Sequence, residues 1–110
     1  MIDQLLGALE AGQVQFSEVL SVIESMYFYK PAAFKNGNVH NASHENQGSA
    51  KVFAFARLNG FNEAQTLSLF AEHYKAVLSD PTGTNHQNIR QFMEHGWKGI
   101  SFETNALIKK

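Results

Sequence analysis

The chain has 110 residues, of which 44% are apolar and two are Pro, a composition that excludes a disordered or fibrous protein. The net charge of −1 excludes the basic field that nucleic acid or an anionic membrane requires. The absence of Cys excludes disulfides, thiolate zinc sites and cysteine nucleophiles.

Two helices are predicted in the first 30 residues. Apolar residues at positions 2, 5, 6 and 9 follow the i, i+3, i+4, i+7 spacing of one helical face. Ser17 can cap a second helix, which Lys30-Pro31 should end because the residue before Pro avoids helical angles. Asp3 and Glu10 interrupt the apolar run that a Sec signal peptide needs, so we expect no such signal, and no stretch is long enough for a membrane span.

The first 29 residues carry four acidic and no basic side chains, whereas residues 30–110 carry six acidic and nine basic ones. The formal charge is therefore −4 in the first segment and +3 in the second. This asymmetry is typical of two helices with acidic solvent faces. It is also compatible with a docking surface for a basic partner.

Residues 31–49 are predicted to form one long irregular loop, rich in Asn, His, Gly and Ser. Asn36-Gly37 is a turn signal, and Phe34 and Val39 on either side could form a short hairpin. Irregular connections longer than about 12–15 residues are uncommon in compact domains and tend to be functional or disordered. We expect an ordered loop held by Phe34.

His40 and His44 in this loop have the i, i+4 spacing of helical zinc ligands, and Glu45 follows them. The surrounding turn residues favour a loop, in which this spacing has no fixed geometry. We therefore predict no metal site, and leave an ordinary polar loop or a ligand-contacting loop as the alternatives.

Three further helices and a tail are predicted after residue 49. Ser49 can cap a helix that is apolar nearly all round and therefore central, closed by Gly60. Asn62 and Gln65 form a capping box for a helix up to residue 78. Thr84 and Gln87 form a second capping box, for a helix that Gly96 ends. The tail after this helix could add a short strand or cover the core. The fold class is mainly α: a compact single-domain bundle of about five helices, with the loop at about 31–49 and at most a minor two-stranded element.

The start of the last predicted helix is a candidate ligand site. His86, Arg90 and Glu94 share one polar stripe, and the first-turn N–H groups beside Asn85 and Asn88 could bind an anion. A solvated face with an Arg–Glu pair is the alternative. Trp97 stands between two glycines and is either a core anchor or a recognition platform. Together with the loop, the predicted binding residues are Asn36, His44, Glu45, Asn46, His86, Asn88, Arg90 and Trp97.

Two runs, NQGSAKVFAFA at 46–56 and HQNIRQFMEHGWKGI at 86–100, resemble those of the HopJ type III effector family, as do FKNG at 34–37 and the stretch 66–81. The resemblance extends from Leu5 to about Leu107. It implies a small, mainly helical bacterial protein, a single HopJ-like domain over 1–110, in the bacterial cytoplasm or delivered into a host cell by type III secretion. It implies no catalytic residues.

Two functions remain open from the sequence. The first is a type III effector-like, non-catalytic module that binds a host or bacterial protein, which the absence of any catalytic motif favours. The alternative is a small-molecule or anion-binding protein, or an uncharacterised enzyme, with its site between loop 36–48 and the start of helix 86–95. We expect no cofactor, no catalytic residue is assigned, and the oligomeric state is open.

Overall fold

The computed structural model describes residues 2–110. Within this range the chain forms six α-helices, one short 3-10 helix and five strands, and about 54% of it is helical. The helices are α1 (Ile2–Glu10), α2 (Phe16–Met26), α3 (Gln47–Leu58), α4 (Glu63–Ser68), α5 (Glu72–Ser79), α6 (Gln87–His95) and the 3-10 helix η1 (Gly96–Gly99). The strands are β1 (Tyr27–Tyr29), β2 (Phe34–Asn36), β3 (Val39–Asn41), β4 (Ile100–Phe102) and β5 (Leu107–Lys109).

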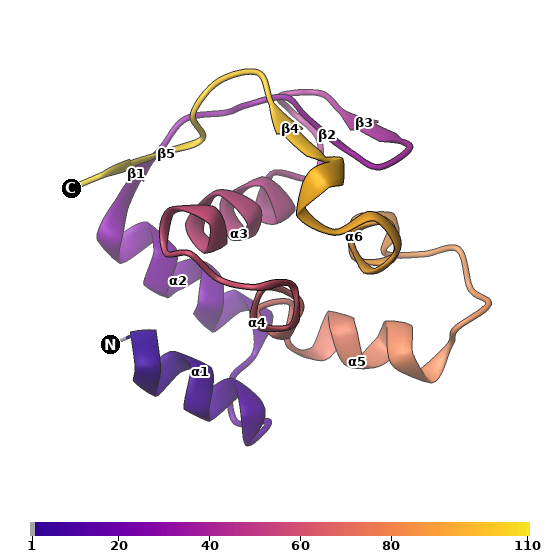
Figure 1. Cartoon of the computed structure of the whole chain (residues 1–110). Helices are drawn as coiled ribbons and strands as arrows, with labels where there is room; N and C mark the ends of the chain where they lie inside the picture. Colours follow the sequence, from indigo (N-terminus) through magenta and orange to yellow (C-terminus); the bar gives the residue numbers. More distant parts are fainter. Residues whose placement is uncertain (1) are drawn as a thin grey trace.

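The strands form two antiparallel sheets, one with the order β1-β5 and the other with the order β3-β2-β4. Figure 1 shows them as a layer along one side of the molecule, with α3 and α6 beneath it and α1, α4 and α5 on the far side of these two helices. Each strand has three residues. The hairpin between β2 and β3 has a two-residue loop in which Gly37 has φ +58°, an angle that Gly adopts without strain.

The prediction of a mainly α bundle with a long irregular loop at 31–49 is wrong. The loop region supplies β2 and β3, and the tail supplies β4 and β5, so the fold is α/β with two sheets. Three residues are too few for a visible two-residue alternation. The pairing partners are also far apart in the sequence, as in Phe34 opposite Phe102.

Several helix boundaries also differ from the predictions. Helix α2 ends at Met26 rather than at Lys30, because Tyr27–Tyr29 leave the helix to pair with Leu107–Lys109. The helix predicted from 63 to 78 is divided into α4 and α5, with Ala71 at φ +52° between them. The predicted capping box of Asn62 and Gln65 is confirmed. 

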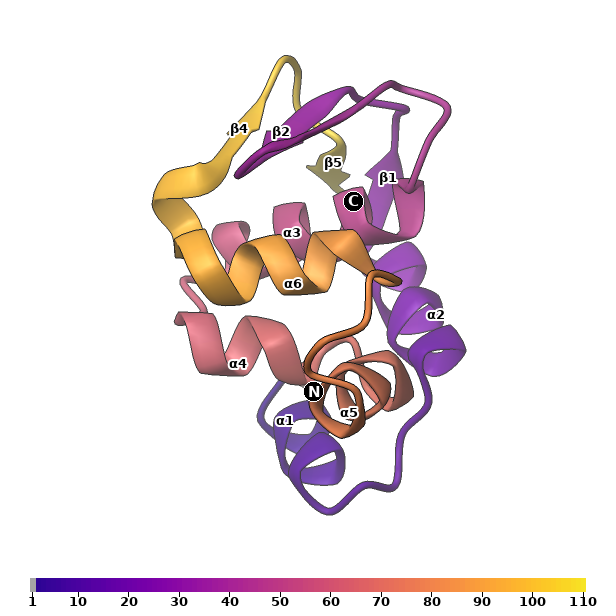
Figure 2. The ribbon, with the colours of Figure 1, turned by 90° about the vertical axis from the view of Figure 1, so that its right-hand side faces the viewer.

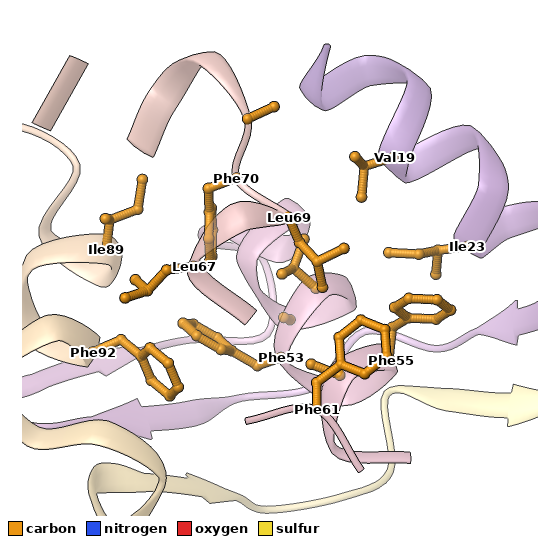
Figure 3. Close-up of a cluster of buried hydrophobic side chains, with 14 of the residues drawn as sticks. Val19, Ile23, Phe53, Phe55, Phe61, Leu67, Leu69, Phe70, Ile89 and Phe92 are labelled. Carbon is orange, nitrogen blue, oxygen red and sulfur yellow. The ribbon is translucent and has the colours of Figure 1, made fainter. Parts of the chain in front are cut away.

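The core is built around α3, as its nearly continuous apolar sequence predicts. Phe53 and Phe55 are fully buried, and Figure 3 shows them among side chains from α2, α4 and α6. The ring of Phe53 lies 5.1 Å from that of Phe92 on α6, and the ring of Phe55 lies 5.8 Å from that of Phe61. Aromatic rings at these separations add to the stability gained from burial. This cluster fixes the position of α6 on α3.

None of the helices in the described range is long and apolar enough to cross a membrane.

Candidate functional site

A pocket of about 380 Å³ lies where the first turns of α3 and α6 meet α2, β3 and α5. Figure 2 shows the N-terminal ends of α3 and α6 on the same side of the molecule, next to α2. The lining residues come from segments far apart in the sequence: Phe16, Val39, Asn46, Gly48, Ser49, Phe70, His73 and residues 86–89. The fold therefore creates this pocket, and no single sequence motif describes it.

Aromatic rings form a continuous wall of the pocket. Phe16 and Phe70 are stacked with their ring centroids 5.8 Å apart, and the edge of His73 meets Phe16 at 4.9 Å. The ring of His86 follows, 5.0 Å from that of His73. Phe16 is held in place because its N–H donates a hydrogen bond of 2.7 Å to Oε1 of Glu72 at the start of α5. The wall is thus apolar at one end and has two imidazoles at the other.

The polar side of the pocket is formed by the beginnings of two helices. The first-turn N–H groups of an α-helix have no carbonyl partner within the helix, and the helix dipole makes this end attractive to negative charge. Gly48 and Ser49 occupy this position in α3, and Gln87 and Asn88 occupy it in α6. Gly48 also brings α3 close to the aromatic wall, since a Cβ there would lie 3.4 Å from Cε2 of Phe16.

Backbone strain is concentrated around the pocket. Within residues 2–110, the non-glycine residues with positive φ are Asn46, Ala71 and His86, each at 52°. Asn46 and His86 are the N-caps of α3 and α6 and line the pocket, and Ala71 lies between the lining residues Phe70 and His73. Such conformations cost about 1–3 kcal/mol each and cluster at functional sites. The strained residues therefore lie in the wall of the pocket or next to it.

Behind the pocket, buried asparagines join the hairpin to α6. Oδ1 of Asn88 accepts hydrogen bonds from Nδ2 of Asn36 (3.0 Å) and of Asn41 (3.2 Å). Nδ2 of Asn88 donates to Oδ1 of Asn41 (3.0 Å), which also accepts from Nδ2 of Asn46 (2.7 Å). Because a buried amide needs partners, these bonds fix β2, β3 and the start of α6 against one another.

Three of the residues predicted from the sequence line the pocket, namely Asn46, His86 and Asn88. Asn36 is fully buried and reaches the pocket only through Asn88. His44 is exposed in the turn before α3 and does not line the pocket.

The other predicted residues have structural contacts elsewhere. Oε1 of Glu45 accepts a hydrogen bond of 3.0 Å from the N–H of Ala42. Arg90 turns away from the pocket and donates to the carbonyl oxygens of Asp80 and Asn85. The indole N–H of Trp97 donates to the carbonyl of Phe61 at 3.0 Å, as expected of a core anchor.

The predicted capping box at Thr84 is wrong. Helix α6 begins at Gln87 with His86 as its N-cap, while Nε2 of Gln87 donates to the carbonyl of Thr84. His40 lies on β3 and His44 follows it in a turn, so their spacing is not helical. In the described part of the chain, no three His, Cys, Asp or Glu side chains lie together as metal ligands.

Eight lining residues were not predicted as binding residues: Phe16, Val39, Gly48, Ser49, Phe70, His73, Gln87 and Ile89. The sequence signal for His73 was weak, because it stands in a stretch that resembles one uninterrupted helix. The break at Ala71 turns Phe70 and His73 toward the pocket, and no Gly or Pro marks that break.

The profile of the family described as HopJ type III effector protein matches residues 2–107. The chain belongs to this family. A crystal structure described as that of the unknown function protein VPA0580 is 45% identical in sequence, with a TM-score of 0.91 over 100% of this chain and 94% of that chain. No curated protein matches the chain. Membership of the HopJ family suggests a type III effector-like protein and type III secretion.

Proposed function

We propose that this HopJ family protein binds a small molecule in the pocket between the first turns of α3 and α6. The ligand class is a compound with a flat or apolar body and one anionic group. The cavity itself carries the proposal: its volume of about 380 Å³ lies in the range of small-molecule sites, and aromatic walls with a few convergent polar groups are typical of them.

The geometry of the loop favours this function over the protein-docking module. The two functions differ in whether the loop and the last helix form a concave site or separate exposed surfaces. Val39 and Asn46, from the region predicted as a loop, line the same cavity as His86 and Asn88. A shared polar cavity is expected of a ligand-binding protein and has no role in a flat docking surface.

The anionic group is supported by the donors on the polar side. First-turn N–H groups of α3 and α6 favour negative charge, and the imidazoles of His73 and His86 add donors 5.0 Å apart, measured between ring centroids. No Asp or Glu lines the pocket. The ring of Phe16 and its neighbour Phe70 offer a stacking surface for the flat body.

The experiment is a titration with phenyl phosphate, followed by two-dimensional NMR of the backbone amides, with benzyl alcohol as the neutral probe of similar size. We expect phenyl phosphate to shift the amides of Gly48, Ser49 and Asn88, and benzyl alcohol to bind at least about tenfold more weakly, which corresponds to 1.4 kcal/mol. Equal binding of the two probes would contradict the anionic class.

A cavity-filling variant tests the location. Ser49→Leu places a larger side chain in the cavity wall, and Ser17→Leu makes the same change on the exposed surface of α2. We expect Ser49→Leu to weaken phenyl phosphate about tenfold or more, and Ser17→Leu to leave it unchanged. Equal melting temperatures establish that both variants are folded. Unchanged affinity in a folded Ser49→Leu would contradict the proposed site.

A further inference from the structure

We propose a second binding site, for a phosphate group, at the C-terminal end of α6. An open hollow of about 460 Å³ lies there between the turn of the β2–β3 hairpin, η1 and β4. Its lining has no acidic and no apolar side chain: Lys35, Gly37, Asn38, His95, Lys98, Gly99 and Ser101. Every side chain in the wall can donate a hydrogen bond, and two are permanently cationic at neutral pH.

The sheet register places the donors on one surface. Lys35 on β2 is directly opposite Ser101 on β4, and its neighbours in the strand, Phe34 and Asn36, are buried. Because side chains alternate along a strand, Lys35 and Ser101 both lie on the outer face. Lys98 comes from η1, which links α6 to β4 (Figure 2). The hollow therefore collects donors from three elements.

The two lysines of the hollow have no carboxylate partner within residues 2–110. Neither Lys35 nor Lys98 forms an ion pair or a side-chain hydrogen bond in this range. The acidic residues closest in sequence are Glu94 and Glu103, and neither lines the hollow. Oε2 of Glu94 lies 3.9 Å from Nε2 of His95, on the α6 side.

The floor of the hollow is rigid and close-packed. The N–H of Gly37 donates a 3.0 Å hydrogen bond to the carbonyl of Gly99, and a Cβ at Gly99 would lie 3.1 Å from the Gly37 nitrogen. A Cβ at Gly37 would collide with His95 and Gln91. The turn is further fixed because the N–H of Asn38 donates to Oε1 of Gln91 at 2.9 Å. A fixed floor holds the backbone that carries these donors in place, so binding requires little ordering of the main chain.

Phosphate is the ligand chemistry that this arrangement fits. Two ammonium groups act as point charges on a compact polyanion, and the hydroxyl of Ser101 and the amide of Asn38 can donate directed hydrogen bonds to it. The wall has no Phe, Tyr, Trp or aliphatic residue among the described residues that line it, whereas Phe16, Phe70, Val39 and Ile89 line the pocket at the other end of α6. The phosphate can come from a soluble phosphorylated compound or from a lipid headgroup.

Pyrophosphate is the soluble probe, and two-dimensional NMR of the backbone amides is the readout. We expect shifts at Gly37, Asn38, Gly99 and Ser101, with no shifts at Gly48 and Ser49 in the first pocket. Co-sedimentation with phosphatidylcholine vesicles, with and without phosphatidylinositol phosphate, tests the lipid source. Sedimentation that requires the phosphorylated lipid would assign a headgroup; pyrophosphate binding without sedimentation would assign a soluble ligand.

The decisive variant is Lys35→Gln with Lys98→Gln, and the matched control is Lys30→Gln with Lys109→Gln, which removes the same charge from exposed positions outside the hollow. We expect the first pair to weaken binding about tenfold or more and the control to change it less than about twofold. Equal weakening by both pairs would show a nonspecific charge effect and overturn the proposal. Absence of binding by pyrophosphate and by the phosphorylated vesicles would overturn it as well.

Discussion

The two ends of α6 lie in different chemical surroundings. At its N-terminal end a pocket has aromatic rings on one side and histidines, amides and helix N–H groups on the other. At its C-terminal end an open hollow has only donors and glycines, with two unpaired lysines. Nine residues at 1.5 Å each, roughly 13 Å, separate these ends. One short helix thus carries two sites whose ligands would differ in kind.

The same hairpin contributes to both ends. Val39 of β3 lines the pocket, while Lys35 of β2 and Gly37 of the turn line the hollow. Asn88 holds this hairpin against α6 through Asn36 and Asn41. Each site thus has its own lining residues, whereas the same hairpin and the same asparagines hold both sites in place. Substitutions in the buried residues that hold the hairpin and α6 together should therefore weaken binding at both sites. Substitutions of lining residues should weaken binding at one site only.

The largest effect is expected for Phe92→Ala, which removes the buried ring that fixes α6 on Phe53. Loss of a buried Phe side chain destabilises a protein by about 3–5 kcal/mol. Urea denaturation gives the free energy of unfolding, and NMR should show changed amide shifts at both ends of α6. Met93→Ala is the matched control, because the next side chain on the helix is 46% exposed. A similar loss in both variants would contradict the role of Phe92.

Asn88→Ala is expected to have the next largest effect. The change removes three buried side-chain hydrogen bonds: two that Oδ1 of Asn88 accepts from Asn36 and Asn41, and one that its Nδ2 donates to Asn41. Such a loss costs about 2–3 kcal/mol in the free energy of unfolding. Asn105→Ala, at an exposed position, is the control and should change stability by less than about 0.5 kcal/mol. If Asn88→Ala behaved like the control in thermal denaturation, the shared support would have to lie elsewhere.

Gly37→Ala should affect ligand binding at the C-terminal end of α6 but not at its N-terminal end. Gly37 has φ +58° and no space for a Cβ, whereas Gly60 has φ +68° with nothing within 4 Å of an added Cβ. Both variants carry the strain of a left-handed residue, about 1–2 kcal/mol. Only the Cβ added in Gly37→Ala would also collide with the side chains of His95 and Gln91. We therefore expect this variant to lose about 1 kcal/mol more of its free energy of unfolding, measured with denaturant. Pyrophosphate binding to the hollow should weaken, while the amide shifts that phenyl phosphate causes at Gly48 and Ser49 in the first pocket should persist.

The smallest effect is expected for Gly48→Ala, in the first turn of α3. An added Cβ would meet Phe16 at ordinary contact distance, and Ala favours the helix by up to about 1 kcal/mol over Gly. We expect equal or slightly higher stability together with weaker phenyl phosphate binding, because the methyl group narrows the pocket. Gly7→Ala in α1, with open space around it, is the control for helix propensity alone. If Gly48→Ala bound phenyl phosphate as tightly as the unchanged protein, the ligand would not contact Gly48.

Helical features that depend on local sequence were predictable. The stripe of α1, the burial of α3 and the capping box of Asn62 and Gln65 all follow from spacing within one element. The hairpin at Phe34 and Val39 was indicated by Asn36-Gly37 and is present. What failed were the pairings of β1 with β5 and of β2 with β4, since nothing in a three-residue strand identifies a partner some 70–80 residues away.

The candidate site was predictable only in its polar half. Asn46, His86 and Asn88 were predicted as polar residues of the loop and of the last helix, although those helix starts were expected at Ser49 and Thr84 rather than at Gln47 and Gln87. The aromatic half depends on the turn at Ala71, which is strained and carries no Gly or Pro. Local rules predict unstrained backbone, so they miss a strained turn that tertiary packing enforces.

The pairing of β1 with β5 affects how the chain folds as it is made. Tyr27 lies opposite Lys109, and the N–H of Lys110 donates to the carbonyl of Met26, so this sheet joins residues some 80 positions apart. At 5–20 residues per second, roughly 4–16 s pass between the synthesis of the two strands. During that time β1 has no partner strand. A nascent chain therefore exposes the unpaired backbone groups of β1 until Leu107–Lys109 have been synthesised.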